Sequence, residues 1–137
     1  MATVSPQLRT IAETAFEALN SGDLDAYLSV IAEDVEFTSM IAEVEGVTFR
    51  GHDGVRDWWH TVRGSFQDLT WELLELHECE PGALANLRAI GSVGGIEVDQ
   101  TVWQAATFRD GKLTWWAFFR TEKDARKALV AGPRAQL

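Results

Sequence analysis

The N-terminal part of the chain carries apolar residues at the spacing of amphipathic helices. Between Ser5 and Gly22 they recur every three or four positions, which places one apolar stripe along a helix. Ser5 can cap free N–H groups, and Pro6 loses no hydrogen bond in a first turn. Asp23 then predicts the start of a second, short helix. The inward positions predicted for the two helices are Leu8, Ile11, Ala12, Ala15, Phe16, Leu19, Leu24, Tyr27, Leu28 and Ile31.

After the second helix the pattern changes, which predicts a strand, a loop and a third helix. From Val35 apolar and polar residues alternate with a period of two, as in a short strand. The loop spans residues 41–51 and carries Glu43 and Glu45, in a segment of the kind that often bears functional groups. Asp53 can cap the third helix. Its wide apolar stripe consists of Val55, Trp58, Trp59 and Val62.

The second half of the chain has the pattern of an antiparallel sheet. Segments rich in β-branched and aromatic residues are separated by turn signals, of which Asp110-Gly111 is typical of a two-residue hairpin. These segments cover about residues 69–79, 83–93, 97–109 and 112–121. A sequence similar to a capping box, from Thr121 to Asp124, then predicts a short helix that Gly132-Pro133 ends. Helices followed by a meander indicate an α+β fold.

Length, charge and cysteine content limit the possible function classes. The 137 residues suit a single domain, 1–137, with an ordered core over about 5–132 and a frayed tail at 133–137. A net charge of −9 disfavours binding to nucleic acid or to an anionic membrane. We find no signal peptide and no apolar run of about 20 residues, and the single cysteine, Cys79, agrees with a reducing compartment. A cytoplasmic protein is therefore expected.

Two phrases, together with the order of the predicted elements, resemble a known family. These are Gly51–Trp59 (GHDGVRDWW) and Thr107–Leu113 (TFRDGKL). They are similar to the SnoaL-like, polyketide cyclase-like branch of the nuclear-transport-factor-2-like superfamily, whose fold is also called cystatin-like. The resemblance covers about Ser5 to Gly132. It implies a strongly curved antiparallel sheet that forms a cone around a pocket closed by N-terminal helices. Family members include isomerases, cyclases, dehydratases, epoxide hydrolases and proteins that only bind ligands, so the fold alone does not give the function.

The register of the Asp110-Gly111 hairpin decides which side chains face the pocket. A regular two-residue turn puts Thr101, Trp103, Ala105, Trp116, Phe118 and Arg120 on one face. The resemblance assigns the positions of Trp116, Phe118 and Arg120 to the pocket wall. A bulge near the turn would instead turn Gln100, Val102 and Gln104 toward that face.

On the regular register Asp99 lies diagonal to Arg120, and the two form the candidate catalytic pair. They could bind the polar end of a substrate, or Asp99 could act as a base. The alternative is a salt bridge at the rim with little energetic weight.

The remaining predicted pocket residues are mostly apolar or aromatic. The predicted ligand pocket consists of Phe16, Leu19, Ser39, Trp58, Val62, Thr101, Trp103, Trp116 and Phe118. Flat aromatic walls suit planar or polycyclic ligands, although core packing alone would also explain such residues. Trp115 and Phe119 alternate onto the convex face, where exposed aromatic residues would indicate a homodimer interface.

The catalytic patterns of the family are mostly absent. Ser39 stands where steroid-isomerase-like members carry a carboxylate base, and Arg88 lacks the Arg-x-Asp context of epoxide-hydrolase-like members. The three histidines, His52, His60 and His77, are not spaced as metal ligands or as a dehydratase pair. We therefore expect no metal and no cofactor.

The sequence supports two functions. The first is a small-molecule pocket protein, in the manner of an isomerase or cyclase, that acts on a hydrophobic, partly polar substrate. The second is a non-catalytic dimeric module of the same fold that binds a ligand or serves in assembly. The sequence alone leaves open whether the protein is an enzyme.

Overall fold

A single six-stranded sheet organises the chain, with its strands in the order β2-β1-β6-β5-β4-β3. The computed structural model describes residues 4–38, 48–61 and 68–131. The strands are β1 (Ile31–Thr38), β2 (Thr48–Arg50), β3 (Leu69–Cys79), β4 (Gly82–Val93), β5 (Ile96–Arg109) and β6 (Lys112–Phe119). The helices are α1 (Pro6–Ser21), α2 (Leu24–Leu28), α4 (Gly51–Thr61) and α5 (Glu122–Ala131). The α+β fold class is confirmed.

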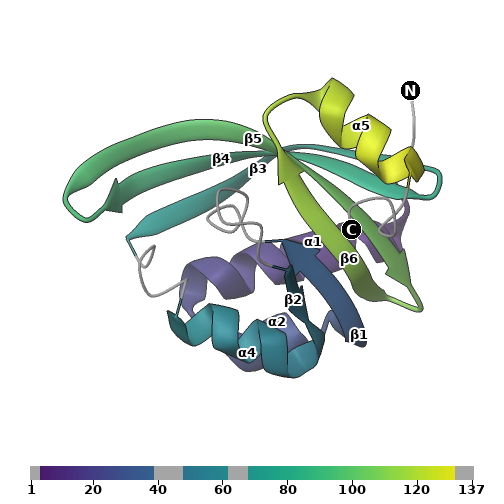
Figure 1. Cartoon of the computed structure of the whole chain (residues 1–137), viewed down its shortest axis with the longest axis horizontal. Coiled ribbons are helices and arrows are strands. Elements are labelled where there is room, and N and C mark those ends of the chain that lie inside the picture. The colour runs from purple at the N-terminus through teal and green to yellow at the C-terminus, as the bar shows by residue number, and fades with distance from the viewer. Residues whose placement is uncertain (1–3, 39–47, 62–67, 132–137) are drawn as a thin grey trace.

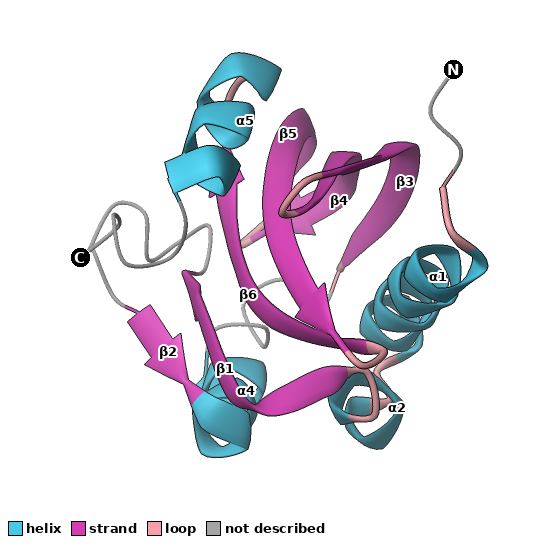
Figure 2. Cartoon of the chain, turned by 90° about the vertical axis from the view of Figure 1, so that its right-hand side faces the viewer, coloured by secondary structure: helices cyan, strands magenta, loops and turns pink. Residues whose placement is uncertain are grey.

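Helices cover both faces of this curved, unclosed sheet. In Figure 1, α1, α2 and α4 lie on one side of the strands and α5 lies on the other. Figure 2 shows the same division from a second direction, with α1 against the β3 side and α4 near β1 and β2. We call the side covered by α1, α2 and α4 the inner face, and the side covered by α5 the outer face. No helix among the described residues is both long and apolar enough to cross a membrane.

The strand connections agree with the predicted meander and add one pairing to it. Strands β3 to β6 pair antiparallel in chain order, as predicted. Strand β1 pairs with β6 in parallel, with Phe37 opposite Trp116, and this long-range pairing has no local sequence signal. The strand predicted from Val35 begins at Ile31, a residue predicted to lie in the second helix. The short strand β2 lies in a segment predicted as loop, and α4 begins at Gly51 rather than at Asp53.

The Asp110-Gly111 turn forms as predicted, but a bulge follows it. Both turn residues have positive φ, of 55° and 79°, and Arg109 pairs with Lys112. The register then shifts, because Phe108 pairs with Leu113 whereas Thr107 pairs with Trp115. The extra residue is Thr114, whose hydroxyl lies 2.7 Å from that of Thr107. The regular register was therefore wrong, and the bulged alternative is the observed one.

Two hydrogen-bonded attachments hold α1 to the edge strand β3. At the N-terminal end, the Ser5 backbone N–H donates to Glu78 Oε1 at 2.9 Å, and the Ser5 hydroxyl accepts from Leu8 N–H. At the C-terminal end, Asn20 Nδ2 donates to the Trp71 carbonyl at 2.9 Å, and the Trp71 N–H donates to Asn20 Oδ1 at 2.8 Å. The Asn20 side chain thus satisfies an edge-strand backbone pair that would otherwise face solvent. Helix α1 is fixed across the inner face at both ends.

Helix α5 covers the outer face with an apolar layer. Ala125, Ala128 and Leu129 pack on the outer side chains of β4, β5 and β6. Trp115 is part of this layer and is only 3% exposed. The prediction that Trp115 is a solvent-exposed aromatic residue was therefore wrong, since α5 covers it. Phe119 is half-buried at the edge of the same cluster.

Candidate functional site

A cavity of about 330 Å³ lies between the inner face of the sheet and the helices. Helices α1, α2 and α4 and strands β1 and β3 to β6 all contribute to its wall. This volume falls within the usual range of small-molecule sites, about 300–1,000 Å³. The wall is overwhelmingly apolar and aromatic, so the cavity suits a ligand that is itself largely apolar.

Short side chains on the central strands leave this space unfilled. On β4 the inward positions include Ala83, Ala85 and Ala89, and on β5 they include Ala106. Each alanine ends near the backbone, and from α1 the side chain of Phe16 packs against the neighbouring cluster of Ala85, Leu87 and Val102. Apolar space of this kind is costly in a protein interior unless something occupies it, because its lining loses contact partners. The hollow is therefore a property of the sequence of β4 and β5.

Aromatic rings form one end of the cavity. Phe37 stacks on Trp116 with their centroids 4.4 Å apart and an interplanar angle of 20°. Tyr27 meets Trp116 edge-on at 6.2 Å and lies stacked beside Trp58 at 6.1 Å. Further along the wall, Trp71 stacks on Phe118 at 6.3 Å. These rings are held by one another in fixed orientations, so the wall offers flat surfaces to a planar ligand.

A few neutral polar groups interrupt the apolar wall. Tyr27 comes from α2, Trp58 from α4, and Gln100 and Gln104 from β5. Among the wall residues that the structure describes, none is Asp, Glu, His, Lys or Arg. Burial raises the pKa of Tyr27, so its hydroxyl stays protonated at neutral pH. The described wall can therefore donate and accept hydrogen bonds but carries no formal charge.

Sequence reasoning missed Tyr27 as a site residue and named the two glutamines only under the bulged register. A usable signal existed for Tyr27, because it is the sole tyrosine of the chain and stands at an inward helix position. A phenol at such a position brings a polar group into an apolar layer. Gln100 and Gln104 lie an even number of positions apart on one strand, so both amides lie on the same face of the sheet. The register decided whether that face borders the cavity.

Several predicted pocket residues lie in the cavity wall. Phe16, Leu19, Trp58, Trp116 and Phe118 all line it, and their role in ligand binding stays a prediction. Ser39 and Val62 lie outside the described residues, and so do the loop residues Glu43 and Glu45.

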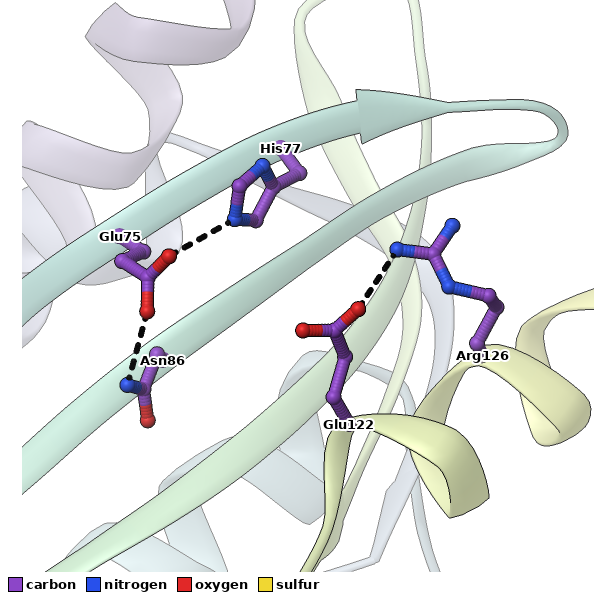
Figure 3. Close-up of polar contacts among 5 residues, drawn as sticks. All are labelled: Glu75, His77, Asn86, Glu122 and Arg126. Carbon is purple, nitrogen blue, oxygen red and sulfur yellow. Dashed lines mark hydrogen bonds and ion pairs between the residues drawn. The ribbon is translucent and has the colours of Figure 1, made fainter.

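The bulge moves two other predicted pocket residues to the outer face. Thr101 is exposed there, and Trp103 stacks on His77 with centroids 6.2 Å apart. Figure 3 shows the polar group beside them, in which Glu75 contacts His77 Nε2 at 3.2 Å and accepts from Asn86 Nδ2 at 3.3 Å. None of these residues lines the cavity.

The predicted pairing of Asp99 with Arg120 is absent from the structure. Asp99 accepts two hydrogen bonds of 2.9 Å from Arg88, in a bidentate ion pair on the outer face. The hydrogen bonds from Arg88 lower the pKa of Asp99, so this carboxylate is a weaker base than usual. Arg120 follows β6 and is exposed. Both residues lie away from the cavity wall, because Val98 and Gln100 are the side chains that point inward around Asp99.

The histidines are likewise dispersed. His52 Nε2 lies 2.7 Å from the Ile31 carbonyl, where it links α4 to β1, and His60 is exposed on α4. Within residues 4–38, 48–61 and 68–131, no group of three or more His, Cys, Asp or Glu side chains is arranged to hold a metal ion.

Comparison with known proteins supports the fold and the family. No curated protein matches the sequence. Among solved structures, a putative polyketide cyclase from Sinorhizobium meliloti shares 22% identity with a TM-score of 0.63, over 80% of this chain and 93% of the other. The protein TerC, co-crystallised with polyporic acid, shares 19% identity with a TM-score of 0.73, over 93% and 100%.

A third similar structure is an NTF2-like protein of unknown function from Burkholderia pseudomallei. It shares 16% identity with a TM-score of 0.75, over 91% of this chain and 98% of the other. At these identities the three likenesses show the fold alone. A family model described as the SnoaL-like domain matches residues 12–116, from α1 to the cavity residue Trp116. With most of its length matched in this way, the chain belongs to the SnoaL-like domain family.

Proposed function

We propose that this protein binds a small, largely apolar, planar molecule in the inner-face cavity and acts on it as a cyclase or isomerase. The observation that carries this proposal is a hollow of about 330 Å³, bounded by fixed aromatic rings and only a few neutral polar groups. Such a wall excludes water and holds a flexible or planar substrate in one conformation. The likeness to a putative polyketide cyclase supports the reaction class.

Cyclisation is a reaction that such a wall can promote by holding the substrate. In an intramolecular aldol closure, an enol carbon attacks a carbonyl carbon, a C–C bond forms, and the enol proton ends on the new alkoxide oxygen. No oxidant and no cofactor are required. The described wall supplies positioning and neutral hydrogen bonds to the oxygen atoms, and both lower the barrier.

The two neighbouring tryptophans of β6 provide a matched test of binding. Trp116 lines the cavity, whereas Trp115 lies under α5 on the other face. A ligand at one hundred times its Kd stabilises the native state by about 2.7 kcal/mol. We expect polycyclic aromatic ketones to raise the melting temperature of the native protein and of Trp115→Ala, but not of Trp116→Ala.

The phenylalanine variants at both positions repeat this comparison with a smaller loss of stability. The same thermal shift in Trp116→Ala as in the native protein would place the ligand elsewhere. If no compound in the series shifts the native protein, the binding proposal is wrong.

The second candidate is the non-catalytic dimeric module predicted from the sequence, which binds a ligand or serves in assembly. It is favoured by the absence of charged side chains from the described wall, since acid–base catalysis usually needs one. An aromatic 1,5-diketone, whose spontaneous aldol closure to a six-membered ring is followed by absorbance, separates the two candidates. Faster closure with the native protein than with Trp116→Ala supports a cyclase, and tight binding without acceleration supports the module.

The homodimer and the cytoplasmic location also remain proposals. Because α5 covers Trp115, the remaining residue for a convex-face interface is the half-buried Phe119. Sedimentation of native protein and of Phe119→Asp tests the homodimer, which should dissociate in the variant.

A further inference from the structure

An open groove of about 490 Å³ lies outside the inner-face cavity, between α1 and the edge strand β3. Figure 2 shows α1 beside this edge of the sheet. The groove is lined by Leu73 of β3 and by side chains from residues 12–21 of α1. Among its described lining residues, only Ala12 and Phe16 also line the cavity. A ligand in the groove would therefore occupy a separate site.

The floor of the groove is apolar and firmly held. Phe16 and Leu73 are half-buried, and both pack against the same buried cluster on β4 and β5. Asn20 lines one end of the groove, and its side chain exchanges hydrogen bonds of 2.9 and 2.8 Å with the Trp71 backbone. The groove is thus a fixed feature of the contact between α1 and β3, and it offers apolar surface to a ligand.

Two carboxylates give this groove a negative rim. Glu13 and Glu17 are exposed, lie four positions apart on one side of α1, and both line the groove. None of its described lining residues is Lys, Arg or His. Arg9 lies outside the groove, and its contact with Glu13 is 3.8 Å long and solvent-exposed, so it neutralises little of this charge. Together with the net charge of −9, the rim attracts cations and repels anions.

The size of the groove favours a small molecule over a protein partner. Its volume falls in the range of small-molecule sites, about 300–1,000 Å³. A stable protein interface needs about 800 Å² and 20–30 residues on each partner, which is much more than part of one helix and Leu73 provide. Phe16 adds an aromatic ring to the floor, and aromatic rings attract cations. Charge and size therefore agree on the class of ligand.

We propose that the groove between α1 and β3 is a second ligand site, which binds a small organic cation, a protonated amine attached to an apolar group. The ammonium group lies beside Glu13 and Glu17, and the apolar group covers Phe16 and Leu73. Neutral molecules of the same shape bind through the floor alone, and anions are repelled. This site goes beyond the function proposed for the cavity and does not depend on it.

Three phenyl compounds of similar shape test this proposal. They are 2-phenylethylammonium, which is a cation, 2-phenylethanol, which is neutral, and 3-phenylpropanoate, which is an anion. Each is titrated into native protein, into Glu17→Gln and into Asp124→Asn. The last variant removes the same charge from α5, on the other face of the sheet (Figure 1). NMR shifts of the Leu73 backbone amide and the Asn20 side-chain amide measure binding in the groove.

The cation should bind native protein most tightly of the three compounds. At low ionic strength its Kd should rise about two- to fivefold in Glu17→Gln, because one exposed carboxylate is lost, and should not change in Asp124→Asn. Added salt should weaken binding of the cation to native protein and leave binding of phenylethanol unchanged. Glutamine keeps the shape of glutamate at an exposed helix position, so Glu17→Gln should fold as the native protein does.

Equal Kd values of the cation in native protein and Glu17→Gln would overturn the proposal. The same holds if phenylethanol or phenylpropanoate binds as tightly as the cation. Shifts confined to the indole signals of Trp58 and Trp116 would place the amine in the cavity instead of the groove, and would also overturn it. If no groove signal moves with any probe, the groove is not a ligand site, whereas the cavity proposal, which is tested with aromatic ketones, is unaffected.

Discussion

The two faces of the sheet use the same kinds of residue for opposite purposes. On the outer face, Trp115 fills a layer that α5 seals with Ala128 and Leu129. On the inner face, its neighbour Trp116 is equally buried but borders a hollow. The difference comes from what stands opposite each ring. A covering helix contacts Trp115 closely, whereas the alanines of β4 and β5 leave space beside Trp116.

This contrast shows that burial alone does not separate structural from functional aromatic residues. Both tryptophans are 3% exposed. Among the described residues, the inner face combines aromatic rings with unfilled volume and with a buried polar atom, Trp58 Nε1, that has no hydrogen-bond partner. A closely packed face contributes to the stability of the fold, and a loosely packed face is free to bind a ligand.

The largest expected effect is a difference in the free energy of unfolding between the alanine variants of Trp115 and Trp116. Trp115→Ala should lower the free energy of unfolding by about 3–5 kcal/mol, because it leaves a void in a buried apolar layer. Trp116→Ala should cost less, since it enlarges a space that already exists. Urea denaturation followed by circular dichroism measures both. An equal or larger loss for Trp116→Ala would contradict the contrast between the two faces.

The second effect concerns the alkaline stability of the inner face. Because burial raises the pKa of Tyr27 above that of the unfolded chain, its contribution is present in full below about pH 10 and falls as the pH rises further. The free energy of unfolding should fall by about 1.4 kcal/mol for each pH unit in that range. Subtracting the same measurement on Tyr27→Phe removes the contributions of lysine and arginine.

Absorbance at the phenolate band reports this titration directly, because the chain has one tyrosine. Denatured protein should titrate near pH 10, and native protein should form its phenolate only at higher pH. A native titration close to pH 10 would mean that the phenol is in contact with water.

The third effect concerns the attachment of α1 to β3. Asn20→Ala removes two hydrogen bonds with the Trp71 backbone and should cost about 1 kcal/mol, since the bonds are solvent-exposed. Asn20→Asp keeps the acceptor and should cost less. Hydrogen exchange of the Trp71 amide should be faster in the alanine variant than in the aspartate variant. Unchanged exchange would show that the side chain does not protect this edge.

The smallest effect is expected on the outer face. Asp99→Asn removes an exposed ion pair with Arg88, remote from the cavity wall. Ligand affinity should not change, and the melting temperature should change little at neutral pH. A large loss of cyclase activity in this variant would restore the catalytic role that the sequence suggested for Asp99.

Local chemistry was enough to predict most elements of the fold. The Ser5 cap, the helical stripe behind it and the Asp110-Gly111 turn all formed where the residue types require them. The bulge at Thr114 was not predictable in the same way, because one extra residue in a strand changes no propensity and is selected by packing across the whole sheet. That single residue decided whether Trp103 or Gln104 faces the cavity.

The candidate site was predictable only in part for the same reason. Phe16, Trp58 and Trp116 could be assigned to the inner face from helical stripes and from the family resemblance. The position of α5 over Trp115 could not be predicted from the sequence, since it depends on the path of the chain after β6. The alanines of β4 and β5 make room for the hollow, but its size also depends on how closely α1 approaches β4, and a sequence pattern does not contain that distance.

The parallel pairing of β1 with β6 has a consequence for how the protein is made. Phe37 and Trp116 stack although they are roughly eighty positions apart in the chain, so this contact closes one of the longest loops in the molecule. A nascent polypeptide that has left the ribosome only as far as β5 cannot complete the chamber. The cavity wall is thus complete only once β6 has been made and pairs beside β1.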